Sequence, residues 1–134
     1  MKYKVLIGIL GMDQHEVGSV IIAKMLRDAG FEVIYIGRFN TPSSVLRSAI
    51  AEDVDVIGLS CHSWEYLHFV PGLIEQLQKE AADIGLVVGG SVITPKDGQS
   101  LLKMGVDAVF GPDSTSDVII ERMTAICSRR GQMD

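Results

Sequence analysis

The chain has 134 residues, of which 47% are hydrophobic, with 14 glycines and 4 prolines. This length suits one domain spanning residues 1–134, and the composition excludes a disordered or fibrous protein. The formal net charge of −5, without a dense basic cluster, argues against nucleic acid as a partner.

Three features indicate the compartment. The N-terminus lacks the layout of a signal peptide, and no apolar run approaches the roughly 20 residues of a membrane span. The two cysteines, Cys61 and Cys127, fit neither a disulfide framework nor a zinc pattern. We therefore expect a cytoplasmic protein with reduced thiols and no membrane partner.

Five apolar runs of strand length follow one another along the chain. The predicted strands are residues 5–9, 33–36, 54–59, 84–88 and 108–110. They lack a polar alternation, which favours strands buried on both faces of a parallel sheet. Segments with helical spacing separate them, for example Val20, Ile21, Met25, Leu26 and Ala29. The order predicts an α/β protein with a doubly wound, five-stranded parallel sheet.

Several helix ends have their own signals. Thr41-Pro42 and Thr94-Pro95 each place a capping hydroxyl before a proline at the first helical position. Gly30 and Gly105 stand where a left-handed residue ends a helix, just before a predicted strand.

Ligands of such sheets bind beyond the carboxyl ends of the strands, which selects residues 10–18, 60–64, 89–94 and 111–116. The first of these segments contains Asp13-Gln14-His15-Glu16-Val17-Gly18. A neutral imidazole suits a transition metal, and a nearby carboxylate fixes its tautomer. A single histidine cannot enclose zinc, so the other ligands of a metal on His15 must come with a cofactor. Alternatively, Asp13 and Glu16 form a capping box that opens the first helix, and the two interpretations are compatible.

The other strand ends carry weaker signals. Gly89-Gly90-Ser91 either lets a ligand approach the backbone or forms an ordinary turn. Gly111-Pro112-Asp113-Ser114 either caps the last helix or joins the same pocket. The glycine motifs of dinucleotide and phosphate-loop sites are absent, and Asp53 and Asp55 fall at the opposite edge of the sheet.

The motif D-x-H-x-x-G, matched by Asp13, His15 and Gly18, resembles that of the B12-binding domain of the base-off/His-on type. This family occurs in methylmalonyl-CoA mutase, glutamate mutase and related enzymes, and has a flavodoxin-like, Rossmann-like fold. The likeness covers nearly the whole chain and extends over residues 29–33, 40–42, 60, 89–90 and 110–112.

The resemblance implies that the dimethylbenzimidazole of cobalamin leaves the cobalt and that the nucleotide tail enters a pocket between sheet and helices. His15 then becomes the lower axial ligand of the cobalt, and Asp13 hydrogen-bonds to it. Ser60 would hold the tail, and Gly89-Gly90 would make room for its base. The expected cofactor-binding residues are Asp13, Gln14, His15, Glu16, Val17, Gly18, Ser60, His62, Gly89, Gly90, Ser91, Gly111 and Ser114.

The family uses the corrin for radical carbon-skeleton rearrangement, with the substrate held by a separate (β/α)8-barrel subunit or domain. The resemblance therefore implies a small subunit of an acyl-CoA mutase, with adenosylcobalamin as cofactor, methylcobalamin as the alternative, and no catalytic residue of its own. Two other hypotheses stay open: a corrinoid protein of a methyltransferase system, and a cobalamin-binding regulatory module.

The sequence departs from the family at three places. Ile9 stands where acyl-CoA mutases carry a lysine, Ser60-Cys61-His62 replaces S-x-L, and Asp113-Ser114 replaces the end of a G-P-G-T turn. His62 either stacks on the tail base, indicates a different lower base, or lies in a solvent-facing loop. Either Trp64 and Tyr66 form part of a docking face towards a partner or the corrin rim, or Trp64 packs on the sheet.

Overall fold

The computed structural model describes residues 3–10, 17–61, 66–80, 83–90, 93–111 and 114–132. Strands and helices alternate along the described chain. They are β1 (Lys4–Leu10), α1 (Val17–Asp28), β2 (Glu32–Asn40), α2 (Pro42–Glu52), β3 (Val56–Ser60), α3 (Tyr66–Glu80), β4 (Gly85–Gly89), α4 (Pro95–Met104), β5 (Ala108–Phe110) and α5 (Ser116–Gln132).

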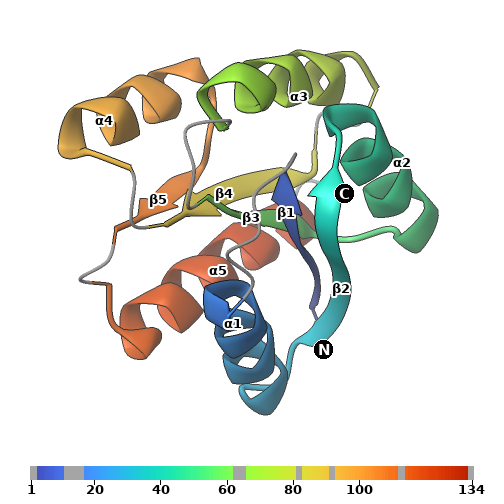
Figure 1. Cartoon of the computed structure of the whole chain (residues 1–134). Coiled ribbons are helices and arrows are strands. Elements are labelled where there is room, and N and C mark those ends of the chain that lie inside the picture. The colour runs from blue at the N-terminus through green and yellow to red at the C-terminus, as the bar shows by residue number, and fades with distance from the viewer. Residues whose placement is uncertain are drawn as a thin grey trace.

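The strands form one parallel sheet in the order β2-β1-β3-β4-β5. Helices α1 and α5 lie against one face, and α2, α3 and α4 lie against the other (Figure 1). This arrangement confirms the predicted doubly wound, flavodoxin-like α/β fold. The strand order switches between β1 and β3, which is where such sheets bind ligands at their carboxyl edge.

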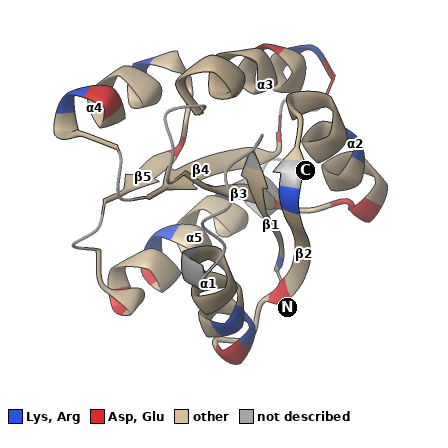
Figure 2. Ribbon diagram, viewed as in Figure 1, with Lys and Arg blue, Asp and Glu red and all other residues tan. Residues whose placement is uncertain are grey.

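The core is divided into two apolar layers because successive side chains of a strand point to opposite faces. Leu6 and Ile57 face α2–α4, where they pack with Leu73, whereas Val5 and Val56 face α1 and α5. Figure 2 shows the charged residues mainly on the helices and at the strand starts, around an uncharged β3 and β4.

The predicted helix ends are confirmed, with one addition. The Thr41 and Thr94 hydroxyls each accept a hydrogen bond from a backbone amide three residues later, and Gly30 and Gly105 have positive φ. Asp53 ends α2 with φ 52°. The sequence did not predict this left-handed residue because it is not a glycine. The amide of Val54 then bonds to the end of α2, so β3 begins at Val56 rather than at residue 54.

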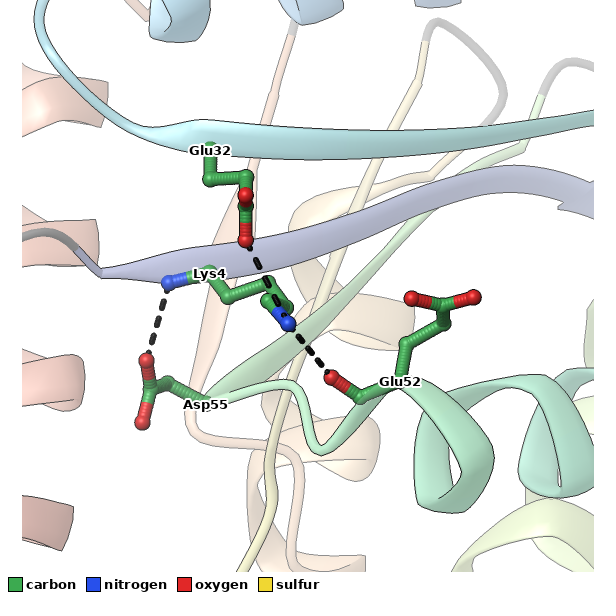
Figure 3. Close-up of polar contacts among 4 residues, drawn as sticks. All are labelled: Lys4, Glu32, Glu52 and Asp55. Carbon is green, nitrogen blue, oxygen red and sulfur yellow. Dashed lines mark hydrogen bonds and ion pairs between the residues drawn. The ribbon is translucent and has the colours of Figure 1, made fainter.

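The amino edge of the sheet is closed by polar contacts (Figure 3). The Asp55 carboxylate accepts a hydrogen bond from the Lys4 amide at 2.9 Å, and the Lys4 ammonium donates to the Glu52 carbonyl at 2.9 Å. The same ammonium lies 3.3 Å from a carboxylate oxygen of Glu32. Asp55 is thus occupied in holding β1 to β3, as its position at the edge away from the predicted ligand site suggested.

Two elements differ from their predicted extent. Strand β2 continues past Gly37 to Asn40, because the buried Asn40 amide donates to the Ile9 carbonyl at 3.0 Å and holds the strand end on β1. In α1, the predicted apolar stripe is only partly buried: Leu26 is fully buried, but Val20 and Ile21 are 48% and 60% exposed. The first half of α1 therefore leaves part of its apolar surface uncovered.

Candidate functional site

A cavity of about 350 Å³ lies between the sheet and helices α1 and α5 and extends to the carboxyl ends of the strands. Its lining residues are uncharged and mostly apolar: Ile7, Ser19, Ile21, Ile22, Leu26, Gly58, Leu59, Ser60, Val87, Val88, Gly89, Gly90, Phe110, Gly111, Ser114, Ile119 and Met123. Such a cavity takes an uncharged, largely apolar group, with hydroxyls available at its walls.

Five of the residues predicted from the sequence meet in this cavity: Ser60, Gly89, Gly90, Gly111 and Ser114. They come from three separate strand ends, which only the parallel sheet brings together.

The other predicted residues are distributed differently. Val17 and Gly18 are the first two residues of α1. The remaining six lie outside the described residues: Asp13, Gln14, His15, Glu16, His62 and Ser91.

The floor of the cavity was not predicted. Ile7, Gly58 and Val87 are paired across β1, β3 and β4 and form one row of the sheet. Ser60 and Gly89 form the next row toward the carboxyl edge. Gly58 lies inside the predicted strand 54–59, and a glycine in the interior of a strand marks a close approach of another group, so the signal was present in the sequence.

Gly90 is held in place by the backbone around it. Its φ is 154°, and a Cβ added to it would overlap the carbonyl oxygen of Cys61. The Cys61 amide donates to the Gly89 carbonyl at 2.7 Å, and the Gly90 amide donates to the Phe110 carbonyl at 3.2 Å. The missing side chain of Gly90 therefore makes room for the neighbouring strand end, whatever the cavity holds.

Helix α1 forms one wall of the cavity and is tied to the sheet by a polar contact. The Ser19 hydroxyl is fully buried and lies 3.1 Å from the Tyr35 hydroxyl on β2. This hydrogen bond holds the first half of α1 against β2, although Val20 and Ile21 in that half are exposed.

On the opposite face, Tyr66 is buried at the start of α3, so it packs in the protein rather than forming an exposed docking face. Its hydroxyl donates to the Asp97 carboxylate of α4 at 3.2 Å. Burial, with smaller contributions from the charge and hydrogen bond of Asp97 and from Cys61, raises the pKa of Tyr66 to about 12. Trp64 lies outside the described residues.

The described residues form neither a metal-binding cluster nor a membrane-spanning helix. Within the ranges that the structure describes, no group of three or more His, Cys, Asp or Glu side chains is placed to hold a metal ion. None of the described helices combines the length and apolarity needed to cross a membrane. Cys61 and Cys127 are buried thiols in the two different apolar layers.

Comparison with known proteins identifies the family and the fold of the chain. The B12 binding domain model matches residues 3–120. The small subunit of 2-hydroxyisobutanoyl-CoA mutase from Aquincola tertiaricarbonis is 36% identical over 128 residues, covering 96% of this chain and 94% of that protein. The small subunit of pivalyl-CoA mutase from Xanthobacter autotrophicus is 43% identical over 125 residues, covering 92% and 82%.

A solved structure of a cobalamin-binding protein from Desulfitobacterium hafniense superposes with a TM-score of 0.77 at 21% identity. The match covers 96% of this chain and 59% of that one, and shows a shared fold. The family of the chain is shown by the match over residues 3–120 and by the two relatives above. The chain belongs to the B12-binding domain family.

Proposed function

We propose that this chain is the cobalamin-binding small subunit of an adenosylcobalamin-dependent acyl-CoA mutase. The observation that carries the proposal is the cavity at the carboxyl edge of the sheet, lined by Ser60, Gly89, Gly90, Gly111 and Ser114. All five lie at the strand ends that were selected from the sequence. The two mutase small subunits that match the chain over most of their own length support the same function.

The residues present fit the nucleotide tail of a cobalamin. The cavity of about 350 Å³ suits an aromatic base with part of its sugar rather than a whole macrocycle. Its apolar side chains suit the faces of the base, and the Ser60 and Ser114 hydroxyls, near the carboxyl edge, suit the polar atoms of the sugar and phosphate.

In this proposal His15 would be the protein ligand that holds the cobalt. Asp13 accepts the other ring N–H of His15, which fixes the tautomer and orients the ring. Ser60 holds the tail in the cavity. Bound adenosylcobalamin supplies a cobalt–carbon bond whose homolysis starts radical rearrangement of the substrate.

The proposal assigns the substrate to a second subunit. A large (β/α)8-barrel subunit would bind the acyl-CoA and close over the cobalt. Ile21, which lines the cavity, and its neighbour Val20 are exposed apolar residues of α1 that a bound cofactor or subunit would cover. The chain alone would bind cofactor but turn over no substrate.

The test is a visible-absorption titration of the full chain with hydroxocobalamin and adenosylcobalamin, followed by EPR of the bound hydroxocobalamin after a one-electron chemical reductant has converted it to Co(II). We expect one corrinoid per chain and a nitrogen splitting in the Co(II) spectrum that changes when the protein nitrogen is isotopically labelled. His15→Ala should eliminate that splitting and weaken binding. The control is His68→Ala, an exposed histidine on α3, which should bind as the parent does.

Two results would contradict the proposal. Failure of the parent chain to bind either corrinoid would reject the cofactor. Binding with a spectrum that His15→Ala leaves unchanged would reject His15 as the ligand. Mutase activity that requires an added large subunit, and is lost in His15→Ala, would support the division of roles.

A further inference from the structure

Gly58 stands in the middle of β3 without a backbone reason to be glycine. It is buried, and its φ is not among the positive values of the described glycines, so an L-residue would fit its conformation. Glycine in a strand interior is less stable than alanine because it loses more entropy and packs no side chain. A reason for its presence must come from the space above it.

Other strand glycines are explained by packing. A Cβ on Gly8 would meet Ile36 atoms at 2.7 and 2.9 Å, and a Cβ on Gly85 would meet Cγ2 of Ile126 in α5 at 2.6 Å. Each of these glycines therefore admits a large neighbouring side chain.

An added Cβ on Gly58 would also meet an isoleucine, but this isoleucine lines the cavity. The nearest atom to an added Cβ is Cδ1 of Ile7 at 2.7 Å, and the next is Cγ2 of Val87 at 3.6 Å. Cδ1 is the far end of a flexible side chain, and Ile7 itself lines the cavity. Gly58 thus adjoins one terminal methyl group and the cavity.

The position of Gly58 makes it the deep end of the cavity. Ser60 and Gly89 lie at the ends of their strands, and Gly58 lies two residues further in, about 7 Å at the usual rise per residue. Ile7 and Val87, which pair with Gly58 across the sheet, line the cavity at this level, and Met123 of α5 belongs to the same apolar cluster. A group seated there finds hydrocarbon rather than hydrogen-bonding partners on these walls.

We infer that Gly58 sets the depth of the cavity and so restricts it to tails that end in a flat, apolar base such as a benzimidazole, in preference to a purine. The inference rests on the proposed function, since it concerns the tail of the bound corrinoid. A purine would bury ring nitrogens and an amino group against apolar side chains, and burying polar atoms without partners is unfavourable.

The experiment measures dissociation constants of the full chain for three corrinoids: cobalamin, the adenine-based analogue, and cobinamide, which has no base. The parent chain should bind cobalamin about tenfold or more tightly than the adenine analogue. Gly58→Ala should raise the dissociation constant for cobalamin about tenfold, because one methyl group at a tight site changes affinity by that order. The dissociation constant for cobinamide should stay within about twofold of the parent value.

Two further variants separate loss of depth from loss of structure. Ile7→Val in the Gly58→Ala chain removes Cδ1, the atom that the new methyl group displaces, and should restore most of the cobalamin affinity. Gly72→Ala is the matched control: it lies on α3, and an added Cβ has nothing within 4 Å. Its affinities should equal those of the parent.

If Gly58→Ala does not fold, as judged by circular dichroism, Met123→Phe narrows the same deep end from α5 and should show the same selective loss. Three outcomes would each overturn the inference but leave the proposed function standing. The folded variant could bind cobalamin as tightly as the parent, it could lose equal affinity for cobalamin and cobinamide, or the parent could bind the adenine analogue as tightly as cobalamin. Failure of the parent to bind every corrinoid would overturn both.

Discussion

The two faces of the sheet are built from alternate residues of the same strands, yet they are packed differently. On the α2–α4 face, Leu6, Ile57 and Leu73 belong to one continuous buried cluster. On the α1–α5 face, the row of Ile7, Gly58 and Val87 has a cavity above it. Both faces carry a buried apolar cluster and so contribute to stability, whereas the cavity at the carboxyl edge lies on the α1–α5 face.

The largest effect is expected where the strand ends meet at the cavity wall. Gly90→Ala places a methyl group on the Cys61 carbonyl at a φ of 154°, so we expect a loss of about 4 kcal/mol or more in the free energy of unfolding, or no folded protein. Gly111→Ala is the control, because its Cβ has nothing within 4 Å, and should change stability by less than about 0.5 kcal/mol.

Urea denaturation of both variants gives these values. Equal stability of the two variants would mean that the β3 and β4 ends can separate. The cavity wall would then be less rigid than the geometry indicates.

The next effect tests the α2–α4 face. Leu73→Ala removes a fully buried side chain from α3, and we expect a loss of about 3 kcal/mol in the free energy of unfolding because the tightly packed surroundings leave a void. Leu67→Ala, on the same helix but 46% exposed, should cost less than about 1 kcal/mol. A small loss for Leu73→Ala would show that this face also has free space, and would remove the contrast between the faces.

The smallest effect concerns the polar link between α3 and α4. Tyr66→Phe removes the hydrogen bond to Asp97, and we expect the free energy of unfolding to fall by about 1 kcal/mol at neutral pH. The folded-state pKa of Tyr66, about 12, lies above the ordinary value of about 10, so the folded protein keeps this proton to higher pH than the unfolded chain does. The stabilising contribution of the protonated Tyr66 hydroxyl is complete below pH 10 and is lost as the pH rises through about 12.

Unfolding measured over this alkaline range should therefore show the parent losing stability relative to Tyr66→Phe. An ultraviolet titration should assign the late-ionising phenol to Tyr66. Asp97→Asn should lower that pKa only in part, because burial is the largest cause of the shift. A parent whose pH dependence equals that of Tyr66→Phe would show that the phenol reaches water.

Much of the fold was predictable because its signals are local. Uninterrupted apolar runs indicated buried parallel strands, and the Thr-Pro and glycine signals located helix ends at Thr41, Thr94, Gly30 and Gly105. Asp53 was missed because a left-handed aspartate has no pattern that distinguishes it from a surface residue. The extension of β2 was missed because it depends on the Asn40 amide reaching the Ile9 carbonyl, 31 residues away in sequence.

The sequence by itself determined the alternation of strands and helices, the edge of the sheet at which the cavity lies, and the resemblance to B12-binding domains that the family match confirmed. Only the tertiary structure decided which side chains face the cavity, because that depends on register across β1, β3 and β4 and on how closely α1 and α5 approach the sheet. Gly58 shows the difference: in the sequence it interrupts an apolar strand, whereas in the folded protein it lies between Ile7 and Val87 at the deep end of a cavity. The role of Gly58 depends on neighbours that are distant along the chain, because the lack of a side chain matters only through the atoms or the space beside it.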